Sequence, residues 1–554
     1  MSAPRPADVS ADLAPSARPR TGRRRRTALA VAVALVASVG CGAAIVRGSG
    51  DAGKQLEVRN APAAVAPVPD AGGDPSGAAA SSMEPDVPVD VSFGPAPTLL
   101  PRHPKPPVSS SSTRPKAVVP TTLPVPGPLL TATPVVTVPP VVVPTLPPSP
   151  VQRDPTFASG GVFTKDFEKG FDTLSALALQ PDGKLLVGGE TITPTNVGDL
   201  VVLRLTVTGT PDPSFGDGGF VRYDAGASEW PSAIVVQPDG KILVAGATGA
   251  VRSSDKPGGV LRLQPNGAVD RSFADNGVLT TDHAFVKGLV LLPDGKIVVV
   301  GSEGDPVRQD DVSLARYTAD GRPDTTFGTN GRTLVDTGST PAKSWWDSAY
   351  GLARLDDGSL MVVGQRSTTA TPDCPCASAL LMRFTADGSL DKGFNQTGWR
   401  TLDFSSFNSA WTVLPDRGGQ AVVGVIVSGA DARQAIVRVR PDGTLDSAFG
   451  DRGVTRFAAG NLTGLARDPL GRIVASSGGS AFELRRFTAD GAEDPTFGVY
   501  RSDVDPSGTE FPFAVVVLPD GRIVHGGYVY RDLAHPTPTG QYDTDWAVER
   551  VALR

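Results

Sequence analysis

The strongest constraint on this chain is a short motif that recurs seven times between residue 154 and the C-terminus. Each copy has the form Asp-x-x-Phe, usually followed by Gly, and successive phenylalanines lie 58, 58, 54, 67, 55 and 48 residues apart. The copies are Asp154/Phe157, Asp212/Phe215, Asp270/Phe273, Asp324/Phe327, Asp391/Phe394, Asp446/Phe449 and Asp494/Phe497. Repetition at such a period is typical of solenoids and propellers, in which each copy forms one supersecondary unit.

Two further elements accompany the motif. A turn of the type Pro-Asp-Gly-Lys, as at Pro181–Lys184, lies between apolar runs, and Asp-Gly in that setting is a strong β-hairpin signal. An apolar run ending in Arg, such as Val202-Leu203-Arg204, completes the copy. Each repeat then has room for four strands. The inner strands are apolar on both faces, as expected for a sheet that is covered on both sides. We therefore predict an all-β fold over residues 151–554, a seven-bladed β-propeller with four-stranded blades.

The spacing between the Arg and the next Asp is eight residues at each of the six complete junctions. Asp154 has no upstream Arg, and Arg550 has no downstream Asp. These two would complete the set if the chain ends meet, as in a closed ring without free sheet edges. We therefore predict that residues 546–553 lie beside residues 154–163. We also predict that the repeated Arg and Asp form a structural ion pair or a turn-capping contact, because functional sites are usually unique.

The motifs resemble the delta-60 repeat family of bacterial proteins, whose units share the Asp-x-[Ser/Thr]-Phe-Gly, Pro-Asp-Gly-Lys and Arg-x-x-x-Asp-Gly pattern. The resemblance covers about 400 residues and is clearest at Asp212–Gly219 and Leu314–Gly321. Later copies depart from it, with Asn395 in place of Gly and Leu470 in place of Asp. The resemblance implies an extracytoplasmic repeat protein and supplies no catalytic residues.

The N-terminal region has the pattern of a membrane address. Residues 1–26 end in four consecutive Arg and are predicted to form a cytoplasmic basic tail. Residues 27–46 contain no charge and are long enough to cross a bilayer, so a transmembrane signal anchor with the remainder extracytoplasmic is expected. Two alternatives stay open: a cleaved signal peptide with secretion, and a lipoprotein lipidated at Cys41.

A proline-rich stretch follows. Residues 51–150 contain 24 Pro and a single aromatic residue, Phe93. Proline fixes φ and lacks the N–H that helices and inner strands need, so neither can propagate here. We predict a disordered, extended linker over residues 47–150.

Residues that could carry chemistry are few. The chain has 3 Cys and 4 His, and it shows no metalloprotease or nucleophile-elbow motif. Asp503, Asp505 and Ser507 resemble the start of a calcium loop, but Ala514 stands where such a loop has its bidentate Glu. Cys374 and Cys376 are a candidate disulfide in an extracytoplasmic setting. Apart from calcium, no cofactor is indicated.

A binding face is predicted from the links that vary most in length. These follow the third strand of each repeat, and the longest lies between Tyr528 and Asp545. Insertions of one class fall on one face of a ring, where partners commonly bind. Tyr528, Tyr530 and the pair Trp345–Trp346 are candidate stacking residues, although packing between blades is the competing interpretation for the tryptophans. The tryptophans follow a first strand and are therefore expected on the opposite face.

Charge constrains the partner. Residues 1–50 carry a net charge of +6 and residues 51–150 carry −1. Since the net charge of the whole chain is −6, residues 151–554 carry −11. An acidic surface disfavours nucleic acid. The function expected from sequence is a non-catalytic binding or scaffolding module for a cell-envelope polymer or protein. The alternatives are a carbohydrate-active enzyme with carboxylates in the propeller channel, and a structural spacer head; the oligomeric state is left open.

Overall fold

The structure is a computed structural model that describes residues 151–553, apart from 168–169, 193–197, 227, 249–257, 284, 306–307, 339–344, 369–375, 406, 429–432, 480, 506–508 and 532–542. The predicted tail, membrane segment and linker of residues 1–150, with Cys41, lie outside the described residues, as do Cys374 and Ser507. Within the described part, no helix is both long and apolar enough to cross a bilayer.

The described residues are almost entirely β-strand, with one short 3-10 turn, η2 (Arg417–Gly419). The strands of the first half are β1 (Gln152–Arg153), β2 (Val162–Lys165), β3 (Phe171–Leu179), β4 (Leu185–Ile192), β5 (Gly198–Leu205), β6 (Phe220–Tyr223), β7 (Trp230–Val236), β8 (Ile242–Ala247), β9 (Gly258–Leu263), β10 (Val278–Thr280), β11 (Phe285–Leu291), β12 (Ile297–Asp305), β13 (Arg308–Tyr317) and β14 (Arg332–Val335). Those of the second half are β15 (Trp345–Arg354), β16 (Leu360–Thr368), β17 (Cys376–Phe384), β18 (Trp399–Leu402), β19 (Phe407–Pro415), β20 (Ala421–Ser428), β21 (Gln434–Val439), β22 (Val454–Phe457), β23 (Asn461–Arg467), β24 (Ile473–Gly478), β25 (Phe482–Phe487), β26 (Val499–Ser502), β27 (Glu510–Val517), β28 (Ile523–Arg531) and β29 (Asp543–Ala552). The all-β prediction is confirmed.

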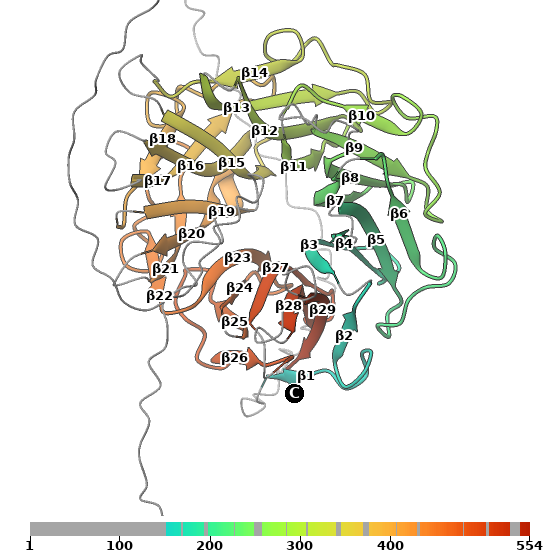
Figure 1. Ribbon diagram of the computed structural model, residues 1–554. Helices are drawn as coiled ribbons and strands as arrows, with labels where there is room; N and C mark the ends of the chain where they lie inside the picture. Colours follow the sequence, from blue (N-terminus) through green and yellow to red (C-terminus); the bar gives the residue numbers. More distant parts are fainter. Residues whose placement is uncertain are drawn as a thin grey trace, which may run out of the picture. The chain divides into compact units, whose positions relative to one another are not determined.

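The strands form antiparallel four-stranded units in chain order. The units are β3–β6, β7–β10, β11–β14, β15–β18, β19–β22, β23–β26, and β27–β29 completed by β2. Two larger sheets arise only because single parallel residue pairs, Thr544–Phe171 and Ala377–Phe407, join neighbouring units. Successive units follow one another around a ring, with β3, β7, β11, β15, β19, β23 and β27 nearest its centre (Figure 1).

The first and last strands of the described chain pair with each other, which we call the seam. β2 pairs antiparallel with β29, from Val162 opposite Glu549 to Lys165 opposite Trp546, and β1 pairs with the end of β29. In Figure 1 the teal β2 lies beside the dark red β29. The predicted contact between residues 546–553 and 154–163 is confirmed. β2 therefore serves as the fourth strand of the unit that contains β27, β28 and β29.

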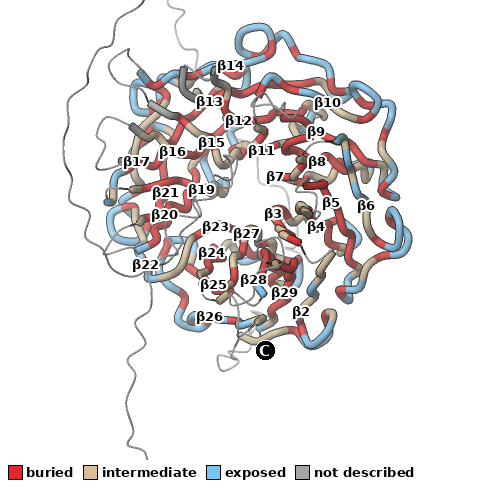
Figure 2. The backbone as a smooth tube through the Cα atoms, viewed as in Figure 1, coloured by how far each residue is buried: buried red, intermediate tan, exposed pale blue. Residues whose placement is uncertain are grey.

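Hydrophobic side chains fill the spaces between neighbouring units. Val298 and Val300 of β12, for example, share a core cluster with Leu360 and Val362 of β16 in the next unit. The middle strands are buried along almost their whole length, and exposed residues concentrate at the turns and outer strands (Figure 2). Both apolar faces of these strands are therefore covered, each by a neighbouring unit, as the sequence pattern predicts.

In six of the seven copies, the repeated Arg donates a hydrogen bond to a backbone carbonyl of the following unit. In the first complete copy, Arg204 Nε lies 2.9 Å from Asp212 Oδ2, and Nη1 donates to the Pro265 carbonyl of the following unit at 2.5 Å. The guanidinium also stands 4.6 Å from the centroid of the Phe215 ring. The second oxygen of Asp212 accepts from the Ser214 amide and hydroxyl, which caps the turn. Both predicted roles, ion pair and turn cap, are thus filled by the same residues.

The same contact, which we call the Arg–Asp lock, recurs around the ring. Nε lies 2.7–2.9 Å from the Asp in Arg262/Asp270, Arg316/Asp324, Arg383/Asp391, Arg486/Asp494 and Arg550/Asp154. In the remaining copy, Arg438 instead places Nε 2.9 Å from Asp416 and reaches Asp446 only at 3.6 Å. At the seam, Arg550 Nη1 donates to the Val207 carbonyl at 2.5 Å. The lock therefore closes the ring by the interaction that joins its units elsewhere.

A glycine in the last hairpin of a unit makes room for the Phe of the preceding unit. Gly388 adopts φ +88°, and a Cβ added there would come within 2.6 Å of the Phe327 ring. Gly491 stands in the same relation to Phe449. Both the left-handed backbone and the close approach require glycine, which explains why Gly stands five residues after the repeated Arg.

We predict that Asp154→Asn lowers the free energy of unfolding by about 3 kcal/mol, because it leaves the buried Arg550 guanidinium without its anion. Asp217, an exposed aspartate two residues after the Phe of its copy, provides the control, and Asp217→Asn should change stability by no more than about 0.5 kcal/mol. Denaturant unfolding of both variants measures the difference. Equal stability of the two would contradict a supporting role for the lock.

Acid should weaken the lock. Burial alone would raise the pKa of Asp154, but hydrogen bonds from Thr156 and charged contacts with Arg522 and Arg550 hold it well below its ordinary value. A pKa that is lower in the folded state stabilises the fold above the unfolded value near 4, and this contribution is lost as the pH falls further. The stability difference between wild type and Asp154→Asn should therefore shrink below about pH 4. A constant difference from pH 7 to pH 3 would refute this linkage.

Candidate functional site

The register of the strands separates two faces of the ring. In the β11–β14 unit, the pairs Phe285–Ser302 and Val312–Val335 lie at one edge, and the Asp-Gly turn lies at the other. The links from second to third strand, and from outer strand to the next unit, leave from the first edge, which we call the loop face. The two hairpins of each unit, with the Asp-x-x-Phe motif, form the turn face.

The expected position of Trp345 and Trp346 is wrong. They are the first residues of β15, and they pair with Thr368 and Ser367 at the end of β16. The outer strand of one unit runs in the same direction as the second strand, so the links that follow both strands leave from the same face. The two tryptophans are therefore at the loop face, together with the length-variable links.

Among the described residues, carboxylates converge at three places on the loop face. In each place three acidic residues offer ligand oxygens within 4.8 Å of one another, and we call these groups the acidic triads. They are Asp166–Asp543–Asp545, Asp199–Asp224–Glu229 and Asp311–Asp336–Asp347. Such oxygen-rich groups are the ligands preferred by Ca²⁺ and Mg²⁺.

Two residues of each triad occupy the same registers of different units. Because Lys165 pairs with Trp546, Asp166 stands opposite Asp545 across the sheet. In the same way, Asp224 and Asp199 are each one residue beyond the pair Tyr223–Leu200 and stand opposite each other. Asp336 and Asp311 are likewise one residue beyond the pair Val335–Val312. Like charges directly opposite in an antiparallel pair are destabilising. An arrangement that costs stability and yet recurs at three junctions points to a role other than packing.

At the start of several inner strands, a fully buried side chain accepts hydrogen bonds from the backbone of the link that precedes the strand. Asp172 Oδ2 accepts from the Phe167 amide at 2.8 Å, and Asp347 Oδ2 accepts from the Thr337 amide and hydroxyl. Asn408 does the same at its junction, where the triad acids are absent. These side chains therefore shape the loop face by ordering its backbone.

The crowding of carboxylates changes their protonation. Burial raises the pKa of Asp172 to about 6 against the lowering effect of Thr191 and the Phe167 amide, and repulsion from Asp166 and Asp543 adds a smaller upward contribution. Burial likewise raises the pKa of Asp545 to about 6, against the attraction of Arg531. An Arg lies close to each triad: Arg531 contacts Asp545, Arg222 Nε lies 2.6 Å from Asp199, and Arg366 Nε lies 3.9 Å from Asp347.

Half-buried residues connect neighbouring inner strands at a common β-bulge. Ser175 donates to the Pro231 carbonyl, and Ser232 donates to the Val286 carbonyl, each at 2.6–2.7 Å. At the same register, Tyr350 and Trp411 stack with their ring centroids 4.6 Å apart and an interplanar angle of 15°. The pattern of inner strands did not single out this pair in the sequence, because the bulge shifts the alternation by one residue.

The other binding candidates of the sequence lie in the interior. Tyr528 and Tyr530 are 6% and 7% exposed, and Tyr528 stacks on Phe511 and Phe513 of β27. A binding role for the two tyrosines stays a prediction, and their burial favours packing. The segment of Asp503 and Asp505 is organised by Glu510, whose Oε1 accepts from the Val504 and Asp505 amides.

A group of hydrogen-bonded polar side chains surrounds Glu549 at the seam. Glu549 is fully buried at the seam, where Oε1 accepts from Arg153, Tyr500 and Ser502 at 2.6–2.8 Å, and Oε2 contacts His525 Nε2 at 2.9 Å. Burial alone would raise the pKa of Glu549, but the contacts with His525, Ser502 and Tyr500 lower it. A shallow hollow of about 630 Å³ adjoins the group and is lined in part by Arg153, Tyr500 and Ser502. The group joins the first strand, the last strand and β26.

We expect Glu549→Gln to lower the free energy of unfolding by about 2 kcal/mol, since hydrogen bonds to a buried charge are replaced by bonds to a neutral amide. The matched control is Glu493→Gln, which alters a half-exposed carboxylate 2.7 Å from Arg485 and should cost no more than about 0.5 kcal/mol. Thermal and denaturant unfolding compare the two. A silent Glu549→Gln would remove the structural role assigned to this group.

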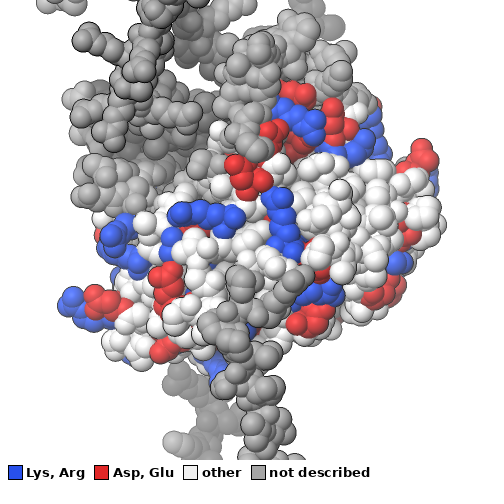
Figure 3. All heavy atoms as spheres, turned by 90° about the horizontal axis from the view of Figure 1, so that it is seen from below, with Lys and Arg blue, Asp and Glu red and all other residues white. Residues whose placement is uncertain are grey.

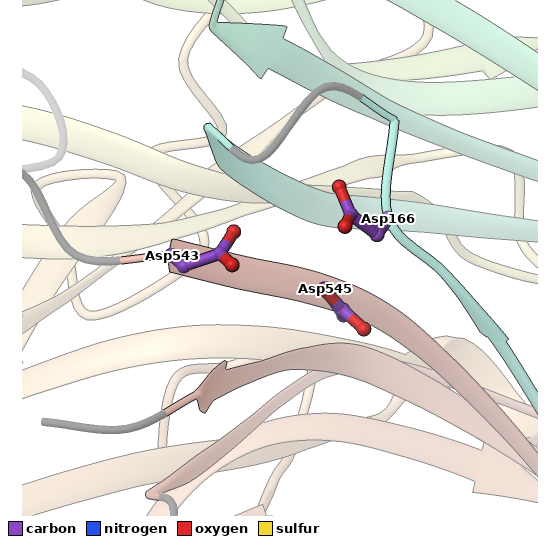
Figure 4. Close-up of side chains that lie close together, drawn as sticks. All are labelled: Asp166, Asp543 and Asp545. Atoms are coloured by element: carbon purple, nitrogen blue, oxygen red, sulfur yellow. The ribbon is translucent and has the colours of Figure 1, made fainter. Parts of the chain in front are cut away.

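Charges of both signs are interspersed on the side of the molecule seen in Figure 3. Among the described residues on that side, Lys and Arg stand next to Asp and Glu rather than in a field of one sign (Figure 3). The triads place part of the acid of the repeats on the loop face, and Figure 4 shows the one at the seam, Asp166–Asp543–Asp545.

Comparison with known proteins identifies the repeats. Residues 180–215, 237–273 and 292–327 match the family described as "Domain of unknown function (DUF5122) beta-propeller". The chain carries β-propeller repeats. Each matched segment runs from a Pro-Asp-Gly-Lys turn to the Phe of the next Asp-x-x-Phe, so the family and the motifs describe the same unit. The propeller prediction is confirmed at this level.

Solved structures with similar folds are distant. They include a catalytically inactive virginiamycin B lyase from Staphylococcus aureus with quinupristin, at 10% identity over 70% of this chain and 98% of that one, with a TM-score of 0.38. Others are an ulvan lyase at 12% identity, over 71% and 94%, with a TM-score of 0.40, and an α-L-arabinofuranosidase from Fusarium graminearum at 11% identity, over 73% and 96%, with a TM-score of 0.32. Similarity at this level carries no argument about activity. No curated protein matches the sequence.

Proposed function

We propose that this propeller is a non-catalytic binding or scaffolding module whose partner docks on the loop face. The observation that carries the proposal is the recurrence of the acidic triads at equivalent registers of three junctions. A catalytic centre is usually built once, from residues that differ between units, whereas a repeated surface offers several similar contacts to an extended partner.

The proposal includes a closed ring of seven blades. Six units are complete within consecutive strands, and the seventh combines β27–β29 with β2. The Arg550–Asp154 lock supports this closure, since it repeats at the seam the contact found between other units. A closed ring holds the links of all units on one rigid surface, which favours multivalent contact.

We further propose that the propeller is held outside the cytoplasm by residues 27–46 and spaced from the membrane by the linker of residues 47–150. Support comes from the four Arg before an uncharged stretch of membrane-spanning length, and from the proline content that follows. Two alternatives to the membrane anchor also place the propeller outside the cytoplasm: secretion after cleavage of a signal peptide, and attachment through a lipid on Cys41.

The partner class follows from the charge of the loop face. Convergent carboxylates repel nucleic acid and suit a cell-envelope polymer or protein that presents cationic groups or is bridged by divalent cations. The stacked pair Tyr350 and Trp411 adds an aromatic surface of the kind that sugars contact. We therefore favour an envelope polymer over a small soluble ligand.

A second function, a carbohydrate-active enzyme, has one observation in its favour. The group around Glu549 occurs in a single unit and adjoins a hollow, as a catalytic site would. However, Glu549 is fully buried with both oxygens engaged, and its neighbours join strands at the seam rather than face the ring centre. This arrangement favours a structural role for Glu549 over a role as a catalytic carboxylate.

The binding proposal is tested by neutralising one carboxylate of each triad. The triple variant Asp166→Asn, Asp224→Asn, Asp336→Asn neutralises the residue after the outer strand at each triad, and binding of the full chain to envelope polymers should weaken at least about tenfold. Glycan arrays and pull-downs from cell-envelope fractions provide the measurement.

The matched control neutralises Asp217, Asp275 and Asp451, three exposed aspartates at equivalent positions of the turn face. This triple variant should bind as wild type does. If both triple variants bind equally well, or if the wild-type chain retains no envelope component, the loop face is not the docking surface.

A further inference from the structure

We propose that the ion pair between Arg153 and Glu549, which we call the seam pair, selects the strand that closes the ring. The lock cannot make this choice, because the same Arg–Asp contact is available at other units. The inference concerns the assembly of the chain and does not depend on the partner proposed for the loop face.

The apolar pattern specifies the closing strand only weakly. β2 has four residues, of which Phe163 is the large apolar side chain that packs against the core at the seam. The segment that leads into β2 has the same Asp-x-x-Phe motif as the segments that lead into the other outer strands. A short strand with so little apolar pattern could also pair beside another third strand, in the same chain or in a second copy.

Two positions beside each lock lie on one face of the sheet. The first is the residue before the repeated Arg. The second is the residue before the Asp, which stands opposite the residue after the Arg. Because residues two apart in a strand share a face, the two positions are diagonal neighbours. In the first five copies both positions are apolar, and the pairs are Leu203/Pro211, Leu261/Val269, Ala315/Pro323, Met382/Leu390 and Val437/Leu445.

The last two copies have ion pairs of opposite polarity at these positions. In the sixth unit, Arg485 on the third strand lies 2.7 Å from Glu493, the residue before the Asp. In the seventh unit, Glu549 on the third strand lies 2.6 Å from Arg153, the residue before the Asp. The charges of the two positions are therefore reversed between neighbouring units.

This polarity excludes the wrong pairings of the first segment. Beside the third strand of the sixth unit, Arg153 would stand next to Arg485, and like charges brought together in this way are strongly unfavourable. Beside any of the first five units, Arg153 would be placed against an apolar side chain without a counter-charge. Of the seven third strands, all of them described at this position, β29 is the one that presents an acidic residue.

The other member of the pair is equally selective. Glu549 and its strand partner His525 are fully buried, at the place where the first unit has Leu203 and Val187. Buried ion pairs add little net stability relative to apolar residues, whereas a buried charge that has lost its partner is costly. Selection of a pairing is the role in which such groups are best attested. A strand without a cation at the position of Arg153 would leave Glu549 in that state.

Replacing the seam pair by the residues typical of other units tests whether it selects or only stabilises. In the full chain, Arg153→Leu, Glu549→Leu and His525→Val are combined. Tyr500 and Ser502 line the hollow, so water can replace their contacts with Glu549. We expect this triple variant to unfold at a denaturant concentration equal to or higher than that of wild type.

Assembly is then measured by refolding both chains from denaturant over a range of chain concentrations. Size-exclusion chromatography with light scattering should show at least about threefold more species larger than the folded wild type, because closure no longer excludes other strands. As a control, Arg332→Gln with Glu303→Gln removes an ion pair of 2.8 Å in the third unit, and this chain should refold as wild type does.

A single substitution separates the two members of the pair. Arg153→Leu alone leaves Glu549 buried without this cation, so the amides of residues 162–165 should exchange at least about tenfold faster than in wild type. The triple variant should restore their protection.

Three results would overturn the proposal. The triple variant refolds with the same distribution of masses as wild type at every concentration, it unfolds at a lower denaturant concentration than wild type, or Arg153→Leu leaves exchange at residues 162–165 unchanged. The second result would make the seam pair a stabilising contact rather than a selecting one.

Discussion

The propeller depends on the Arg–Asp lock. One guanidinium pairs with the Asp of its own unit, covers the Phe ring of the same motif and donates to a carbonyl of the following unit. It thereby couples the turn inside a unit to the contact between units, and the hydrophobic strands pack in a fixed relation. Since Arg550 and Asp154 form the same contact across the seam, the ring needs no separate closing device.

Stability and binding are divided between the two faces. The turn face contains the locks, the tight hairpins and the glycines that admit the phenylalanines of neighbouring units. The loop face contains the variable links and the carboxylates that stand opposite one another in the sheet. Repulsion on the loop face can be tolerated because the turn face and the core hold the ring together. That division lets the loop face carry charge suited to a partner.

Much of this could be predicted from sequence because the repeat makes each feature visible several times. The constant spacing from Arg204 to Asp212 and the unpaired ends Asp154 and Arg550 were sufficient to predict the lock and the seam. The triads could not be predicted in this way, since Asp166 comes beside Asp543 and Asp545 only through strand register across the closure. The face of Trp345 and Trp346 was predicted wrongly because strand direction, not order along the chain, decides where a link emerges.

The central claim is that β2 completes the last unit by pairing with β29. Hydrogen–deuterium exchange of the full chain tests it directly at the amides of residues 162–165. The account predicts that these amides are protected to a similar extent as those of β29, with which they pair. Exchange at the rate of an unstructured peptide, with β29 still protected, would contradict a ring closed at this seam.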